Sequence, residues 1–218
     1  MNNLETLERL SEMGDTHAMA ELGILCYDTG DFKKSISLLE AVTRSETLNA
    51  IALWTLGRAY AEYNSGDKNI TEKVISLWVK ASLLVNKEAC LCLGKAYHNG
   101  YDGKLNIEPN FEKAEHWYTE ALRLGMKVSL FYLGKLYHHK SAKNVEDAVM
   151  AYTYYNSFYV LTSQDKDKFS SLREEAINGM DAMEKSADEL NGGGKIIRAL
   201  RKSNSNLLER LSSRLKFA

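Results

Sequence analysis

The chain has 218 residues, of which 44% are apolar and 26% are charged, and its formal net charge is -1. This is the composition of an ordinary globular domain, and the near-neutral charge excludes a general electrostatic attraction to nucleic acid or to an anionic membrane. The N-terminus has no basic start followed by an apolar run, and no stretch approaches the roughly 18 apolar residues of a membrane span. We therefore expect no signal peptide, no membrane helix and a cytoplasmic protein.

A Leu-Gly pair recurs four times, each time with a small residue four positions before the leucine. The glycines are Gly23, Gly57, Gly94 and Gly134, and their numbers differ by 34, 37 and 40. A recurrence near this period is typical of stacked helical hairpins. Since glycine in a helix costs about 1 kcal/mol relative to alanine, we expect each of these glycines to allow close approach of a partner helix.

A second amphipathic segment follows each Leu-Gly segment. Its apolar stripes are Phe32, Ile36, Leu39 and Val42 in the first copy, Val74, Leu77, Trp78 and Ala81 in the second, Phe111, Ala114, Trp117, Tyr118, Ala121 and Leu122 in the third, and Val145, Ala148, Tyr152 and Tyr155 in the fourth. Steps of three and four residues predict one helical face in each segment. The stretch from residue 4 to 14 is predicted to be the second helix of a truncated leading unit.

The third copy carries a recognisable motif. It reads Ala89-x3-Leu93-Gly94-x2-Tyr97-x2-Gly100-x2-Gly103, then Lys113-Ala114-x2-Trp117-Tyr118-x2-Ala121-x3-Gly125. This string resembles a Sel1-like repeat, a family within the tetratricopeptide class, and the resemblance covers about residues 14 to 160. It implies an all-α, right-handed α-solenoid of about four helix-turn-helix repeats whose inner surface binds another protein.

The chain changes character after the repeats. Residues 165–189 hold eight acidic residues against four basic ones and keep an apolar helical stripe, which predicts a capping helix. Gly192, Gly193 and Gly194 follow as a hinge, and the tail after them is basic with a leucine stripe. We therefore divide the chain into a solenoid over 1–189 and a hinge with an amphipathic tail over 190–218. The tail could fold back on the capping helix, self-associate, or bind a partner or a membrane.

No motif of catalysis or of cofactor binding is present. The chain has no Gly-rich phosphate loop, no Gly-x-Ser-x-Gly elbow and no His-Glu-x-x-His sequence. Its three cysteines, Cys26, Cys90 and Cys92, are expected to be reduced and partly buried, since the last two lie two apart on one helix. We expect no catalytic residue, no metal and no cofactor.

The inner surface remains as the predicted binding site. Cations directly follow three of the packing glycines, with apolar or aromatic residues four positions before the cations and histidines three positions after two of them. The predicted groove residues are Trp54, Arg58, Leu91, Lys95, His98, Phe131, Lys135 and His138. Cations beside aromatic anchors suit an acidic segment of a partner protein.

The resulting functional hypothesis is a non-enzymatic adaptor or scaffold that holds a protein segment in the bacterial cytosol, and we do not expect nucleic acid to be its partner. One alternative is an immunity-type protein that neutralises a bacterial toxin through the same groove. A second alternative is a hydrolase that uses His98, His138 and neighbouring carboxylates.

Overall fold

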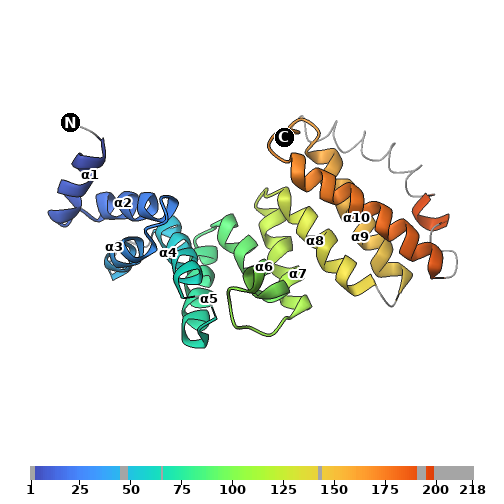
Figure 1. Cartoon of the computed structure of the whole chain (residues 1–218), viewed down its shortest axis with the longest axis horizontal. Helices are drawn as coiled ribbons and strands as arrows, with labels where there is room; N and C mark the ends of the chain where they lie inside the picture. Colours follow the sequence, from blue (N-terminus) through green and yellow to red (C-terminus); the bar gives the residue numbers. More distant parts are fainter. Residues whose placement is uncertain (1–2, 45–48, 65, 142–143, 191–194, 199–218) are drawn as a thin grey trace. The chain divides into compact units, whose positions relative to one another are not determined.

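The structure is a computed structural model that describes residues 3–44, 49–64, 66–141, 144–190 and 195–198. All regular secondary structure within these ranges is helical (Figure 1). The chain divides into two compact units, Met1–Leu124 and Gly125–Ala218, and the division falls inside the stretch predicted as one solenoid. We refer to them as unit 1 and unit 2 and describe each by itself.

Unit 1 consists of a leading helix and three helical hairpins. Its helices are α1 (Asn3–Glu12), α2 (Thr16–Asp28), α3 (Phe32–Arg44), α4 (Ala50–Tyr63), α5 (Lys68–Leu83), α6 (Lys87–Gly103) and α7 (Phe111–Arg123). Each of α2, α4 and α6 packs against the helix that follows it, and α1 packs against α2 as predicted for a truncated leading unit. The predicted all-α hairpin architecture is confirmed.

Unit 2 contains the fourth hairpin and one further long helix. Its helices are α8 (Val128–Lys140), α9 (Val145–Leu161) and α10 (Ser170–Glu189). The last of these packs against both α9 and α8. None of the described helices is long and apolar enough to cross a bilayer.

Short polar side chains fix where most of these helices begin. The carboxylate of Asp15 accepts hydrogen bonds from the backbone N–H groups of His17 and Ala18 at the start of α2. Asn49, Asp67, Asn86, Asn110 and Asn144 cap α4, α5, α6, α7 and α9 in the same way. These side chains satisfy N–H groups that have no partner within the helix, so the caps define the hairpin registers.

The recurring glycines are packing sites. A β-carbon on Gly94 would lie 2.3 Å from Cδ1 of Tyr118, and one on Gly57 would lie 2.4 Å from Nε1 of Trp78. The matching contacts are 2.8 Å to Leu39 for Gly23 and 2.6 Å to Tyr155 for Gly134. In every copy the glycine therefore receives a large side chain from the second helix of its own hairpin.

The ring of Tyr155 lies between two glycines in unit 2. A β-carbon on Gly134 of α8 or on Gly179 of α10 would each lie 2.6 Å from the ring, at Cδ1 and Cε2 respectively. Arg173 of α10 is 7% exposed and donates to the hydroxyl of Thr162 at 3.0 Å and to the carbonyl of Tyr159. These contacts anchor α10 as the capping helix of this unit.

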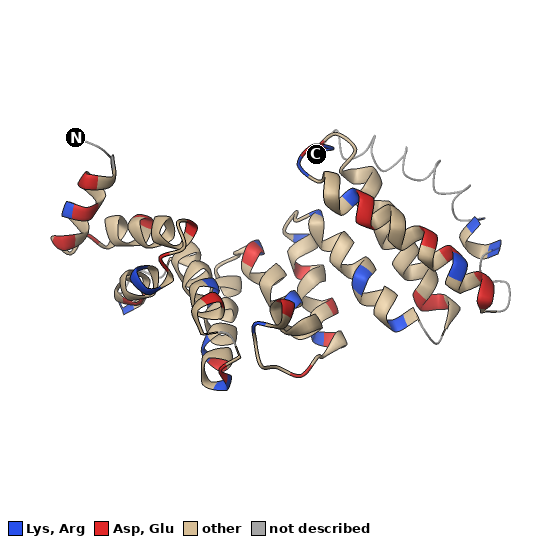
Figure 2. Cartoon of the chain, in the orientation of Figure 1, with Lys and Arg blue, Asp and Glu red and all other residues tan. Residues whose placement is uncertain are grey.

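The first residues after the glycine hinge fold back on α10, whose acidic residues are marked in Figure 2. Residues 195–198 are helical, and Ile197 is fully buried. Arg198 pairs with both carboxylate oxygens of Asp188, at 2.8 and 3.0 Å, and with Glu184 at 3.4 Å. For these four residues the structure supports the fold-back alternative, while Gly192 to Gly194 and the tail over 199–218 lie outside the described residues.

Candidate functional site

The eight predicted groove residues divide between the two units. Unit 1 holds Trp54, Arg58, Leu91, Lys95 and His98, and unit 2 holds Phe131, Lys135 and His138. Their surroundings differ enough that the residues are best taken in three groups: the cation of α4, the lysines with their carboxylates, and the side chains that are buried.

Arg58 lies half-buried against two aromatic rings. Its guanidinium carbon is 4.3 Å from the ring centroid of Tyr27 on α2 and 4.7 Å from that of Trp54 on α4. Such contacts stabilise a cation through the negative face of each ring. Within the described part of the chain, no carboxylate forms an ion pair with Arg58. Its guanidinium has a side-chain hydrogen bond to Tyr101, and the remaining donors are not bonded to a carboxylate of the described residues, although a carboxylate is the acceptor that binds arginine most strongly.

Trp54 is held in place by α6 and by its own hairpin. Its indole Nε1 donates to Sγ of Cys92 at 3.3 Å, and its backbone carbonyl accepts from Nε1 of Trp78 at 3.1 Å. Burial raises the pKa of the Cys92 thiol, so this sulfur stays protonated and uncharged. The aromatic support of Arg58 is thus fixed by contacts from two neighbouring helices.

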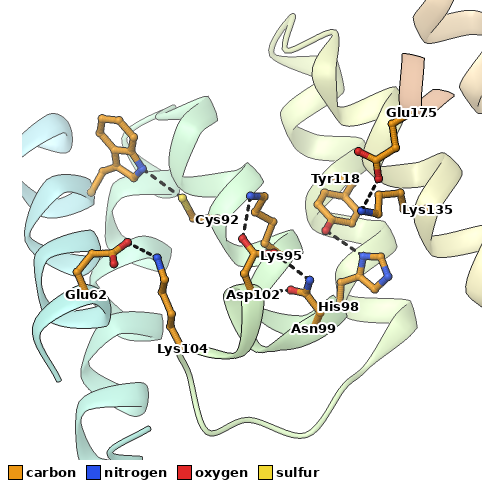
Figure 3. A network of polar contacts seen from close by, with 11 residues as sticks. Glu62, Cys92, Lys95, His98, Asn99, Asp102, Lys104, Tyr118, Lys135 and Glu175 are labelled. Atoms are coloured by element: carbon orange, nitrogen blue, oxygen red, sulfur yellow. Dashed lines mark hydrogen bonds and ion pairs between the residues drawn. The ribbon is translucent and has the colours of Figure 1, made fainter. Parts of the chain in front are cut away.

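Two lysines near Arg58 are paired with carboxylates of unit 1. Lys95 forms an ion pair with Asp102 at 3.2 Å, and Lys104 pairs with Glu62 (Figure 3). Burial would raise the pKa of Asp102, but the charge of Lys95 and hydrogen bonds from Asn99 and Lys95 outweigh it and lower the pKa. Asp102 therefore remains ionised and holds Lys95 at neutral pH.

A left-handed turn at the end of α6 places Asp102 beside Lys95. Four consecutive residues, Gly100 to Gly103, have φ values of 67°, 54°, 60° and 80°. The turn buries Tyr101 against Trp78, with ring centroids 4.9 Å apart. The side-chain amide of Asn99 donates to the carboxylate of Asp102 and accepts from the backbone N–H of Asp102. Sequence reasoning missed Tyr101 and Asp102, although the glycines at 100 and 103 were a signal that the helix ends in an unusual turn.

His98 does not line a groove. It is 5% exposed, its Nδ1 lies 3.2 Å from the hydroxyl of Tyr118, and its ring meets those of Tyr118 and Phe111 edge to face. The physical reason is that the tyrosine ring packed on Gly94 buries its hydroxyl, which requires a polar partner one turn further along α6. This burial does not agree with the expectation that His98 lines the groove.

Unit 2 repeats this arrangement with a half-buried histidine. Nδ1 of His138 lies 3.4 Å from the hydroxyl of Tyr155, whose ring packs on Gly134. Burial lowers the pKa of His138, and the charges of His139 and Lys135 lower it further. A glycine, a tyrosine on the second helix and a histidine four residues after the glycine thus form one packing unit, in two copies.

Phe131 is also a core residue. It is 1% exposed, and its ring centroid lies 5.6 Å from that of Phe158 and 5.9 Å from that of Tyr155. Its assignment to a groove is therefore wrong, because the helices of unit 2 cover this position. Lys135 remains at the surface but pairs with Glu175 of α10 at 2.9 Å, beside a hollow of about 300 Å³.

The described residues offer little for metal chemistry. No group of three or more His, Cys, Asp or Glu side chains within them could hold a metal ion. Cys26, Cys90 and Cys92 are free and buried, and burial raises the pKa of Cys90 to about 11. The arrangement that stands out chemically is the cation of Arg58 on its two rings.

Comparison with known proteins defines the fold. No protein-family model matches the chain, and no curated protein matches it. Among solved structures it is similar to c5321, a protective antigen of uropathogenic Escherichia coli strains that displays an SLR fold, with a TM-score of 0.59 and 19% sequence identity. The match covers 91% of this chain and 43% of that one. The chain therefore has the SLR fold, the Sel1-like repeat architecture that its motifs predict, and spans less than half the length of this structural neighbour.

Proposed function

We propose that this chain is a protein-binding module that holds a carboxylate-bearing segment of a partner on the face formed by α2, α4 and α6. We call this face the Arg58 surface and define it by Tyr27, Trp54, Arg58 and Lys95. The observation that carries the proposal is the half-buried guanidinium of Arg58, stacked on two rings without a carboxylate partner among the described residues.

Partial burial is costly for a charge that lacks an opposite charge. The rings of Tyr27 and Trp54 offset part of that cost. Arg58 also has a side-chain hydrogen bond to Tyr101, and its remaining N–H donors are available to another group. A planar carboxylate matches two of these donors at once, which makes it a favourable ligand for arginine. A glutamate, an aspartate or a chain terminus of the partner meets this requirement.

The surroundings of Arg58 favour a single carboxylate over a polyanion. Lys95 and Lys104 are paired with Asp102 and Glu62, so three cations face two carboxylates. A nucleic acid presents a row of phosphates and gains affinity from several cations, whereas a protein segment with one acid beside an apolar side chain needs only Arg58. Trp54 and the half-buried Leu91 of α6 provide apolar contact for such a side chain.

The proposal covers both the adaptor and the immunity-type role, because the two differ in the partner and not in the chemistry of the surface. Catalysis is not part of the proposal, since His98 and His138 are hydrogen-bonded to the hydroxyls of Tyr118 and Tyr155.

The test is a displayed library of random peptides selected against the full chain, followed by calorimetry with the enriched peptides. We expect the enriched sequences to contain Asp, Glu or a free C-terminal carboxylate next to an apolar residue. Arg58→Gln should weaken their binding by at least about tenfold, as for a central interface arginine. Arg58→Lys should not restore it, because an ammonium lacks the planar pair of donors.

Arg123→Gln is the matched control, because Arg123 is exposed on α7 and paired with Glu120 at 2.8 Å. This control should bind the peptides as the wild type does. Peptides that bind Arg58→Gln and wild type equally would place the functional surface elsewhere.

A further inference from the structure

Three non-glycine residues in the described ranges have a positive φ: Val85 at 61°, Tyr101 at 54° and Asp102 at 60°. This left-handed region costs an L-residue free energy, and the cost is highest for a β-branched side chain such as valine. A residue kept there requires compensation from its surroundings.

Two of the three residues are compensated inside unit 1. The side chain of Tyr101 is buried against Trp78. Asp102 pairs with Lys95 and is bonded twice by Asn99. For these residues the strained backbone is the means by which a stabilising contact is made.

Val85 has no such compensation. Its side chain is 68% exposed in the turn between α5 and α6. The turn is closed by hydrogen bonds from the N–H of Val85 to the carbonyl of Ser82 and from the N–H of Asn86 to that of Ala81. Neither bond involves the valine side chain.

The same turn occurs elsewhere in unit 1 with glycine. Gly14 and Gly30 have φ values of 86° and 84°, and the N–H groups at 14, 15, 30 and 31 make the same two bonds as those at 85 and 86. Glycine adopts this backbone without strain, and it is the usual residue at such a helix end. Valine at position 85 is therefore less favourable than glycine for the backbone conformation of this turn.

The residues before Val85 are exposed and apolar as well. Leu83 is 77% exposed and Leu84 is 39% exposed. Lys80 and Lys87 flank them, both are exposed, and neither forms an ion pair with any described residue. We call residues 83–85 the apolar turn. It combines three adjacent apolar side chains in a fixed backbone with a cation on either side.

We propose that the apolar turn is a second docking site, which inserts into an apolar pocket bordered by carboxylates on a partner protein. Contiguous exposed apolar side chains are typical of interaction sites. Glu88 follows Lys87 in the first turn of α6, but the two lysines leave the surroundings of the turn with a net positive charge, which favours carboxylates around that pocket. This site lies at the end of α5 and is separate from the helix faces that form the Arg58 surface.

The fixed backbone favours a protein over a lipid bilayer. A shaped pocket gains affinity from a side chain held in one position, because less freedom is lost on binding. A fluid bilayer adapts to any position of the side chains and gains nothing from a strained one. Three apolar side chains without an amphipathic helix are also a weak membrane anchor.

The test uses a display library of a small folded helical scaffold with a randomised surface, selected against the full chain. We expect binders with apolar and acidic residues whose affinity falls at least about tenfold with Val85→Gly and with Leu83→Ser. The same binders should keep their affinity for Arg58→Gln, which separates this site from the Arg58 surface. Val85→Gly should raise the melting temperature, because glycine relieves the strain, so lost binding cannot be ascribed to unfolding.

Three outcomes would overturn the proposal. The first is a selection in which no binder depends on Val85 or Leu83. The second is a lower melting temperature for Val85→Gly, which would show that the valine serves the fold. The third is binding to phosphatidylglycerol–phosphatidylcholine vesicles that is lost with Val85→Gly, which would assign the turn to membranes.

Discussion

The cation that follows the packing glycine has opposite surroundings in the two units. In unit 1, Arg58 rests on Tyr27 and Trp54, and the lysines around it are paired with their own carboxylates. In unit 2, Lys135 pairs with Glu175, because α10 packs on α8 and carries an acid at that point. Whether the cation at this repeat position has a carboxylate partner therefore depends on the side chains of the helix that packs beside it.

The residue three positions before the packing glycine shows the same contrast. Trp54 is half-buried and supports Arg58, whereas Phe131 is 1% exposed. The residue at this position lies in the core of unit 2, whereas in unit 1 it lies at the surface. Four predictions test how far this difference between the units extends.

The largest expected effect is on stability from Phe131→Ala. Removing a buried aromatic side chain typically costs about 3–5 kcal/mol, whereas Trp54→Ala should cost less and should mainly weaken peptide binding. Denaturant unfolding followed by far-ultraviolet circular dichroism measures both. Tryptophan fluorescence separates the units, because the three tryptophans, Trp54, Trp78 and Trp117, all lie in unit 1. An unchanged transition for Phe131→Ala would contradict its place in the core.

Gly179→Ala should have the next largest effect. Its new methyl group would meet the Cε2 side of the Tyr155 ring, and the ring has little room to move because Gly134 lies close to its Cδ1 side. Overpacking of this kind costs about 1–3 kcal/mol, which a denaturant titration resolves. Lys185→Ala, an exposed change on the same helix, should leave stability nearly unchanged. If Gly179→Ala and Lys185→Ala both unfold at the same denaturant concentration as the wild type, the contact between α10 and the Tyr155 ring is not tight.

Acidification should destabilise unit 2 through His138. Its pKa is lowered in the folded state, so the unfolded chain binds the proton first as the pH falls. The stability contributed by neutral His138 is complete above the ordinary histidine pKa and is lost as the pH falls below it toward the folded value. His138→Gln should flatten this part of the stability profile, which denaturant titrations at several pH values measure.

The smallest expected effect is that of Lys135→Ala. The pair with Glu175 is exposed on both sides, and such pairs contribute below about 1 kcal/mol. Combining Lys135→Ala with Glu175→Ala in a double-mutant cycle measures the coupling. A coupling well above this range would show that α10 depends on the pair to stay on α8.

The sequence predicted the helical hairpins well because their signals are local and repeated. The Leu-Gly pairs recur where the structure has packing glycines. Three of the side chains that pack on these glycines, Trp78, Tyr118 and Tyr155, were predicted to lie on the apolar stripes of the second helices. The truncated leading helix and the acidic capping helix were also found where they were predicted, as α1 and α10. Each of these features depends on residues within one helix or one hairpin.

The groove prediction was less successful because exposure is not a local property. Matching positions of different copies look equivalent in sequence, yet Phe131 is buried where Trp54 is half-buried, and His98 is buried where His138 is half-buried. The left-handed turn that places Asp102 beside Lys95 was not predicted either, since Gly100 and Gly103 indicate an unusual helix end but do not give a positive φ for the two residues between them. The Arg58 surface itself stays a prediction until a ligand is measured.

The sequence by itself determined the SLR architecture, because a glycine every 34 to 40 residues and a large side chain facing it encode one packing contact many times over. The tertiary structure decided which of these cations has a carboxylate partner and which has none among the described residues. Glu175 lies 40 residues from Lys135, and Tyr118 lies 20 residues from His98. Partners at such separations are brought together only when whole helices stack, so burial and pairing at the site follow from the packing of neighbouring hairpins.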